Sequence, residues 1–205
     1  MITVSNTNDA PFFTSTPTTS AIEDAEYSYQ VTSADIDVGD ILSISGEYPG
    51  WLILVDNGDG TADLSGIPTN DDVGDHSVVL VVTDNSGATD EQSFMINVSN
   101  TNDAPFFTST PPTSAVEDAG YSYTAAASDI DVGDNLTYAA PTLPGWLSFD
   151  ISTQILSGTP LNDDVGTHEV VLTVTDGVEI VEQSFSISVS TVSYTHLTLP
   201  TICSV

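Results

Sequence analysis

The chain contains no lysine and no arginine among its 205 residues. Its 30 aspartates and glutamates give a formal charge of −30, with three histidines as the remaining ionisable bases. Each carboxylate must therefore be hydrated, accept hydrogen bonds or meet a cation from outside the protein. Nucleic acids and anionic membrane surfaces are excluded as partners, because both are recognised through Lys and Arg.

Cysteine and long apolar runs are also scarce. The one cysteine, Cys203, cannot form an internal disulfide, and no apolar run approaches the roughly 20 residues that span a bilayer. The N-terminal sequence Met-Ile-Thr-Val-Ser-Asn lacks the basic start and apolar stretch of a signal peptide. Because no such apolar run is present, we expect no direct membrane insertion. Salt screens the self-repulsion of so many negative charges, so we expect the protein to be located in a saline or Ca²⁺-rich medium outside the cell.

An internal repeat organises the chain. The segment Asn-Asp-Ala-Pro-Phe-Phe-Thr-Ser-Thr-Pro begins at Asn8 and returns intact at Asn102. The segment Asp-Ile-Asp-Val-Gly-Asp begins at Asp35 and returns at Asp129. Self-similarity at one spacing indicates tandem repeats. We predict one repeat over residues 8–101 and a second over 102–191.

Both ends of the sequence depart from this pattern. Residues 1–7 parallel residues 95–101, so we interpret them as the end strand of a truncated upstream repeat. Residues 192–205 include Val-Ser-Tyr-Thr-His-Leu-Thr-Leu-Pro-Thr, which resembles the translated read-through of a transposase-type sequencing adaptor. We expect this tail to be non-native and exclude it. The alternative is a natural C-terminal strand.

Each repeat contains short β-branched or alternating runs separated by Gly, Pro, Asn and Asp, and no stretch has sustained helical spacing. The clearest predicted strands are residues 27–32, 41–45, 51–55, 61–65, 76–83, 91–99, 168–175 and 182–190. Six or seven short strands in about 90 residues indicate an all-β, Greek-key β-sandwich in each repeat. Residues 78–82 are apolar at successive positions, which is typical of a strand covered on both faces.

Four motifs carry a family resemblance. They are Asp-x-Asp-x-Gly-Asp, Leu-Pro-Gly-Trp-Leu-Ser-Phe-Asp, Ser-Gly-Thr-Pro-Leu-Asn-Asp-Asp-Val-Gly and Val-Thr-Asp-Gly, beginning in order at Asp129, Leu143, Ser157 and Val174. The chain resembles the dystroglycan-type cadherin-like and Ig-like tandem repeats of bacterial surface proteins over nearly all of residues 1–190. The resemblance implies two tandem cadherin/Ig-like sandwiches at the cell surface.

The acidic motif has the chemistry of a calcium site. Ca²⁺ takes six to eight oxygen ligands from carboxylates, amides and backbone. Asp35 and Asp37 point the same way from an extended loop, and Gly39 allows a turn that brings Asp40 near. The alternative is that Asp, Asn and Gly form tight turns without a metal. The absence of Lys and Arg favours the metal, because nothing else in the chain neutralises converging carboxylates.

Cadherins bind Ca²⁺ between successive domains, and the resemblance implies the ligands. For the complete junction they are Glu23, Asn100, Asn102, Asp103, Asp129, Asp131 and Asp176. Half of an upstream junction would comprise Asn6, Asn8, Asp9, Asp35, Asp37 and Asp84, and Glu117 would belong to a downstream junction. Asparagine replaces the first linker aspartate, and Pro-Gly-Trp-Leu replaces the Asp-Arg-Glu segment of animal cadherins. We therefore expect one or two ions per junction.

Other conspicuous residues have structural interpretations. Residues 70–74 and their copy at 162–166 are expected to form turns into strands, and residues 56–60 to form a hairpin tip. Two histidines and two tryptophans occupy matching positions and are expected to be structural: His76, His168, Trp51 and Trp146. A sugar-stacking role for the tryptophans is the alternative.

Three classes of function compete. The first is a Ca²⁺-stiffened spacer and adhesion module, whose partners are neighbouring repeats of the same chain, with glycans or a surface protein as further partners. The second is a carbohydrate-binding module of a secreted polysaccharide-degrading enzyme. The third, an enzyme, is not favoured, because every candidate acidic group occurs in both repeats whereas a catalytic site is usually single.

Overall fold

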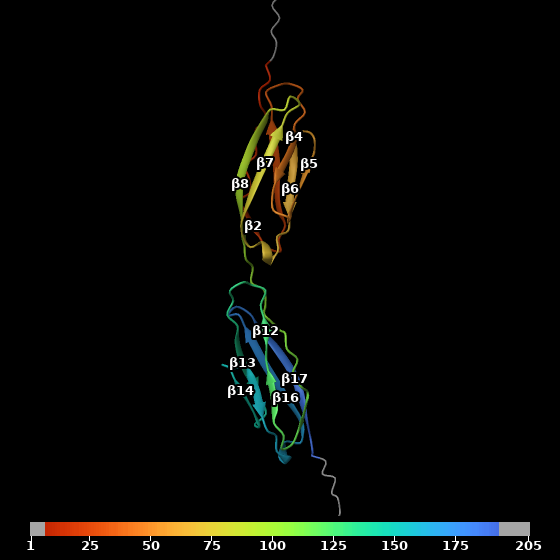
Figure 1. The fold of residues 1–205 in the computed structure, drawn as a ribbon, viewed down its shortest axis with the longest axis vertical. Coiled ribbons are helices and arrows are strands. Elements are labelled where there is room, and N and C mark those ends of the chain that lie inside the picture. Colours follow the sequence, from red (N-terminus) through yellow and green to blue (C-terminus); the bar gives the residue numbers. More distant parts are fainter. Residues whose placement is uncertain (1–6, 193–205) are drawn as a thin grey trace, which may run out of the picture. The chain divides into compact units, whose positions relative to one another are not determined.

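The computed structural model describes residues 7–192 (Figure 1). The chain divides into two compact units, one ending at Thr101 and the other beginning at Asn102. Each consists of β-strands and one short 3₁₀ turn. None of the helices among the described residues has the length and hydropathy needed to cross a bilayer. The predictions of an upstream end strand over residues 1–7 and of an adaptor-derived tail over residues 192–205 concern residues that, except for Thr7 and Val192, lie outside the described range.

The first unit is a sandwich of two four-stranded sheets. Their strand orders are β1-β3-β6-β5 and β2-β8-β7-β4. Neighbouring strands are antiparallel, except that β2 is parallel to β8. The bounds are β1 Phe12–Phe13, β2 Ser20–Ile22, β3 Tyr27–Ala34, β4 Ser43–Glu47, β5 Leu52–Asp56, β6 Thr61–Gly66, β7 Gly74–Thr83 and β8 Thr89–Ser99.

Alternating side chains build the core of the first unit. In β3 every second residue, from Tyr27 to Val31, is buried between the sheets, as a period of two requires. In β7 Val78, Leu80 and Val82 are fully buried. Val79 and Val81 are only half-buried. The prediction that this strand is covered on both faces is therefore wrong, because its outer face has no second layer to cover it fully.

The second unit repeats this arrangement with one interruption. Its sheets have the orders β10-β17-β16-β13, β11-β15-β14 and β12-β9. The position of the long strand β3 is taken by two shorter strands, β11 and β12. The bounds are β9 Phe106–Phe107, β10 Ser114–Val116, β11 Tyr121–Thr124, β12 Ala127–Ser128, β13 Thr137–Thr142, β14 Leu147–Asp150, β15 Ile155–Gly158, β16 Gly166–Thr175 and β17 Ile180–Ser190.

The all-β sandwich prediction is confirmed, and the strand bounds differ from prediction at the ends. Strand β4 begins at Ser43 instead of residue 41, because Ile41 is exposed and lies in the preceding loop. Strands β7 and β8 each begin two residues before the predicted start. The short strands β1 and β2 were not predicted, since two or three residues cannot show an alternating pattern.

The geometry shared by the two units explains the positions of several conspicuous residues. Asn70–Asp72 forms a 3₁₀ turn that leads into β7, and Asn162–Asp164 does the same before β16. His76 Nε2 lies 2.6 Å from the carbonyl oxygen of Asp72, and its ring meets that of Trp51 edge-on at 6.0 Å. Trp51 is half-buried and packs against the core. The contacts of His76 and Trp51 are therefore consistent with the structural roles expected for them.

Candidate metal centre

In the second unit, a loop after β12 carries the second copy of the acidic motif. Gly133 has a φ of +104°, in the left-handed region that favours glycine. This turn returns the chain so that Asp134 lies beside the two aspartates that precede it. One carboxylate oxygen from each of Asp129, Asp131 and Asp134 lies within 4.8 Å of the others. A single loop therefore gathers three negative groups.

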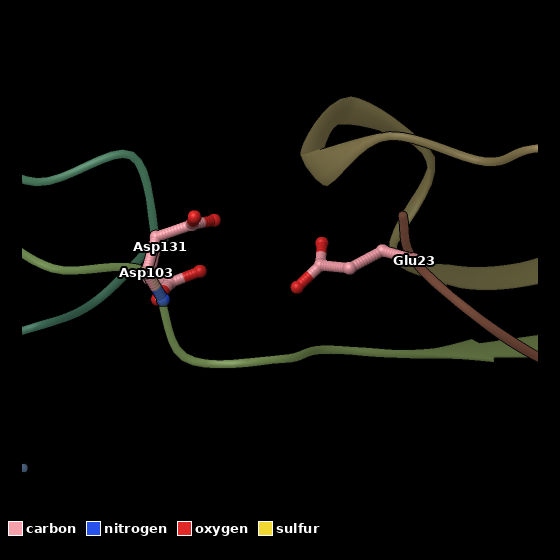
Figure 2. Close-up of side chains that lie close together, drawn as sticks. All are labelled: Glu23, Asp103 and Asp131. Atoms are coloured by element: carbon pink, nitrogen blue, oxygen red, sulfur yellow. The ribbon is translucent and has the colours of Figure 1, made fainter. Parts of the chain in front are cut away.

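The oxygens of this loop are only partly satisfied by hydrogen bonds. Asp129 Oδ1 accepts from the backbone N–H of Asp131 at 3.0 Å, and Asp131 Oδ2 accepts from the N–H of Asp103 at 2.7 Å. Asp129 Oδ2 and Asp131 Oδ1 are buried without a hydrogen-bond partner. Asp131 as a whole is only 6% exposed. Figure 2 shows the side chains of Asp103 and Asp131 next to one another.

A second connection ties the start of the unit to the loop after β16. The amide of Asn102 donates to Asp176 Oδ2 at 2.9 Å. Asp176 Oδ1 accepts from the N–H groups of Val178 and Glu179, each at 2.7 Å. These donors, led by the Glu179 N–H and followed by Asn102, lower the pKa of Asp176, so the group stays ionised.

The same connections recur in the first unit. Asn8 donates to Asp84 Oδ2 at 2.8 Å, and the N–H of Asp9 donates to Asp37 Oδ2 at 2.7 Å. The N–H of Asp37 donates to Asp35 Oδ1 at 2.8 Å. The hydrogen bond from Asn8 is the largest cause of a lowered pKa for Asp84, which is buried. Residues predicted from sequence as half of a metal site thus lie together.

The acidic group of the first unit does not consist of the residues equivalent to those of the second unit. Carboxylate oxygens of Asp35, Asp40 and Asp84 lie within 4.8 Å of one another. Asp35 Oδ2 and Asp40 Oδ2 are buried without a hydrogen-bond partner. The first unit therefore also places unneutralised oxygens next to one another.

Asp40 and Asp134 are the site residues that the sequence prediction did not include. The turn at Gly39 was expected to bring Asp40 near, but neither aspartate was predicted as a ligand. Desolvation raises the pKa of each, and repulsion from neighbouring aspartates raises it further. The Gly-Asp pair that ends each motif was the available signal, since the glycine turn directs the next side chain back to the loop.

Glu23 and Glu117 occupy equivalent places near the other end of each unit. Glu23 is 1% exposed, and its Oε1 accepts from the N–H of Thr101. Glu117 is 7% exposed, and its Oε1 accepts from the N–H of Val192 at 2.8 Å. In both residues Oε2 is buried without a partner. Figure 2 shows the carboxylate of Glu23 extended away from its own backbone.

Two predicted ligands are not placed at a cluster. Asn100 is exposed, and its amide donates to the carbonyl oxygen of the next residue, Thr101, at 3.4 Å. Asn6 lies outside the described residues. The remaining predicted ligands belong to one of these acidic groups, take part in the hydrogen bonds described above, or are the buried glutamates.

The donor set fits a hard divalent cation. All the convergent atoms are carboxylate oxygens, which Ca²⁺ prefers, whereas transition metals favour nitrogen and sulfur. Burying an unpaired anionic oxygen is costly unless a cation or a donor meets it. The chain has no Lys or Arg to do so. Exposed acidic groups alone would be unremarkable, so the buried unpartnered oxygens are the informative feature.

Comparison with known families agrees with the fold. The model of the Putative Ig domain family matches residues 10–99 and again residues 104–195. The chain belongs to this family. Its two Putative Ig domains correspond to the two sandwiches described above. No curated protein matches the chain.

Solved structures place these Putative Ig domains among cadherin-like folds. Protocadherin Gamma B2 extracellular cadherin domains 1-5 match with a TM-score of 0.60 and 17% identity, over 93% of this chain and 41% of that one. Human Protocadherin-24 EC1-2 matches with a TM-score of 0.51 and 19% identity, over 91% and 100%. These identities show likeness of fold alone.

An enzyme is also similar in part. The endo-fucoidan hydrolase MfFcnA4 from glycoside hydrolase family 107 matches with 26% identity and a TM-score of 0.43. The match covers 90% of this chain and 29% of the enzyme. The chain thus spans less than a third of that protein.

Proposed function

We propose that the chain is a Ca²⁺-binding spacer and adhesion module of a larger extracellular or surface protein, in which Ca²⁺ at the connection between repeats stiffens the array. The observation that carries the proposal is a pair of buried carboxylates with unpartnered oxygens, Glu23 in the first unit and Asp131 in the second. Each belongs to the ligand set that the cadherin resemblance implies.

The covalent chain supports a shared ion. Glu23 is hydrogen-bonded to the N–H of Thr101, the last residue of the first unit. The next two residues, Asn102 and Asp103, are hydrogen-bonded to Asp176 and Asp131. Consecutive Cα atoms are about 3.8 Å apart, so very little chain separates the two sets of anchored carboxylates. Carboxylates brought together from the two repeats would repel one another, and a divalent ion bound by both sets would reverse that interaction.

Ca²⁺ would then act through linkage. An ion that binds only the folded, aligned state stabilises it by about 2.7 kcal/mol at a hundredfold excess over Kd. Extracellular calcium modules bind with Kd values of roughly 0.1–1 mM, which suits a medium rich in the ion. The similar protocadherin structures are named as extracellular domains, which supports the same location for this chain.

The proposed partners are neighbouring repeats of the same chain, with a glycan or a surface protein bound at a more distant domain. We propose no catalysis, because the acidic groups occur in equivalent loops of both repeats rather than in one distinctive cleft. A spacer needs repetition, whereas a catalytic centre needs one site.

The test is a titration of the full chain with Ca²⁺ and, separately, Mg²⁺, followed by thermal unfolding and small-angle X-ray scattering. We expect Ca²⁺ to raise the Tm and to lengthen and stiffen the particle, and Mg²⁺ to do much less, because Mg²⁺ demands strict octahedral geometry and retains its water. No change at millimolar Ca²⁺ would refute the proposal, and glycan binding would then be examined.

A matched pair of variants locates the effect. Glu23→Gln removes a charged ligand from the connection between the two repeats, so the Ca²⁺ concentration needed for stiffening should rise about tenfold or more. Glu117→Gln makes the same change at the equivalent position of the second unit and should leave this stiffening unchanged. Equal effects of the two variants would count against a site at the connection.

A further inference from the structure

We propose that each repeat contains a side-chain clip that makes the repeat resist tension applied between its two ends. The clips are formed by Ser15, Tyr29 and Gln92 in the first unit and by Ser109, Tyr123 and Gln183 in the second. The clip is a property of the single repeat and needs no metal. That tension reaches the repeat rests on the proposed spacer function, whereas the geometry of the clip does not.

In the first unit the clip is a closed ring of hydrogen bonds. The hydroxyl oxygens of Ser15 and Tyr29 lie 2.7 Å apart, and Tyr29 donates to Gln92 Oε1 at 2.8 Å. The amide of Gln92 donates to the backbone carbonyl oxygen of Ser15 at 3.0 Å. Because Tyr29 uses its only proton on Gln92, the Ser15 hydroxyl donates the bond between the two hydroxyls. Each member of the ring thus donates one hydrogen bond and accepts one within it.

The second unit contains the same ring. The hydroxyl oxygens of Ser109 and Tyr123 lie 2.7 Å apart, and Tyr123 donates to Gln183 Oε1 at 2.9 Å. The amide of Gln183 donates to the backbone carbonyl oxygen of Ser109 at 2.9 Å. The same three residue types therefore form the same closed set of contacts in both repeats.

The ring joins the first segment of the repeat to the last. Ser15 follows β1, the first described strand of the first unit, and Gln92 lies in β8, the last strand of that unit. Tyr29 lies in β3, which belongs to the opposite sheet of the sandwich from β8. The Ser15 hydroxyl also accepts from the backbone N–H of Thr32 at 2.8 Å. Tension that enters at one end of the repeat and leaves at the other is therefore carried in part across this ring.

Backbone pairing places further hydrogen bonds between the same two segments. Strand β2 is parallel to β8, with Ser20 opposite Asn97 and Ile22 opposite Ser99. In a parallel pair, the N-terminal end of one strand and the C-terminal end of the other lie at opposite ends of the pair. Pulling on these ends slides the strands along each other, so their hydrogen bonds are loaded together rather than one after another. The second unit has the same parallel pairing between β10 and β17.

Burial should make the ring slow to open under tension. Tyr29 is 3% exposed and Tyr123 is 6% exposed, so water has little access to either hydroxyl. A buried donor or acceptor that loses its partner costs free energy until water reaches it. Opening of the ring therefore lies on the barrier to unfolding under tension, and hydrogen bonds between interior strands break after it.

The test is single-molecule extension of the full chain at constant force, with the chain held by tags at its two termini. EDTA is present so that no bound ion contributes. Tyr123→Phe removes the hydroxyl at the centre of the second ring. One of the two unfolding events should then occur about fivefold faster at the same force, the factor expected for one hydrogen bond lost on the barrier. Tyr29→Phe should do the same to the other event, and the double variant should change both.

Tyr138→Phe is the matched control in the second unit. The Tyr138 hydroxyl accepts from the backbone N–H of Ala127 at 2.9 Å, and neither residue lies on the first or the last segment of the repeat. Both variants lose one hydroxyl, so each should lower the free energy of unfolding in denaturant, and these losses calibrate the comparison. For an equal loss in denaturant, only Tyr123→Phe should speed unfolding under tension. Equal acceleration of the two variants, scaled by those losses, would overturn the inference.

The clip and the proposed function can fail separately. If Tyr123→Phe and Tyr138→Phe behave alike under tension while Ca²⁺ lengthens and stiffens the parent, only the clip is refuted. If Tyr123→Phe alone speeds unfolding but scattering of the parent never responds to Ca²⁺, only the Ca²⁺-dependent spacer is refuted.

Discussion

At the scale of single residues, the decisive feature is how carboxylates are satisfied in a chain without cations. Asp84 and Asp176 receive several N–H donors, which lower their pKa values. Asp40 and Asp134 are desolvated beside other aspartates, which raises theirs. Aspartates of this chain thus lie in two kinds of environment, since some accept hydrogen bonds from several donors and others are desolvated beside like charges.

The buried tyrosines give a prediction at the same scale. Tyr27 is 3% exposed and donates to the Thr18 carbonyl at 2.7 Å. Burial, with a smaller contribution from Tyr29, raises its pKa to about 12. Between the ordinary value of 10.0 and about 12 the folded state keeps a proton that the unfolded state loses. The free energy of unfolding should therefore fall across this range.

Alkaline unfolding followed by tyrosinate absorbance and circular dichroism tests this expectation. Tyr121 has the same raised pKa of about 12 in the second unit, so both units should respond. Tyr27→Phe removes this ionising group from the first unit only, so the free energy of unfolding of that unit should fall less at alkaline pH. Tyrosinate formation near the ordinary pKa without unfolding would contradict the prediction.

At the scale of elements, hairpin geometry fixes one glycine in each unit. Gly158 ends β15 and pairs with both Tyr121 and Leu147. A Cβ at Gly158 would lie 1.9 Å from the backbone oxygen of Trp146. A Cβ at the equivalent Gly66 would lie 2.0 Å from the backbone oxygen of Trp51. The close approach is between backbones, so no side-chain rotation can relieve it.

We therefore expect Gly158→Ala to destabilise the second unit by roughly 1–3 kcal/mol, the usual cost of overpacking. Denaturant unfolding gives the measurement. Gly145→Ala is the matched control, because a Cβ there meets nothing within 4 Å. A Gly158→Ala variant as stable as this control would show that the strands separate without cost.

At the scale of the molecule, the two units have separate hydrophobic cores. Leu80 is fully buried in the core of the first unit and Leu172 in that of the second. The core residues named for one unit do not occur in the other. The units should accordingly unfold as two transitions when no metal couples them.

Leu80→Ala tests this independence. Truncating a buried leucine costs about 2–5 kcal/mol through lost transfer energy and the cavity left behind. In EDTA, calorimetry should show one transition lowered and the other unchanged, while Leu172→Ala should lower the other transition. A single transition that moves as a whole in both variants would show that the units fold together.

The sequence by itself determined the repeat, the all-β class and the acidic loops. Repetition of whole motifs identifies two copies without any structure, and alternation of apolar residues predicts long strands such as β7 and β8. The lack of Lys and Arg already indicates that, histidines aside, no side chain of the protein can form an ion pair with these carboxylates. Most residues predicted as ligands lie in loops whose backbone is set by nearby residues, which is why local motifs indicated acidic side chains that lie close together.

Only the tertiary structure decided which oxygens remain buried and unpartnered. Asn8 and Asp84 are 76 residues apart, yet they are hydrogen-bonded, and such pairs depend on how two sheets pack. Packing also brought Asp84, from a distant segment, to Asp35 and Asp40, and left Asn100 exposed. The physical reason is that burial and hydrogen bonding are set jointly by distant segments, whereas sequence patterns report the local backbone.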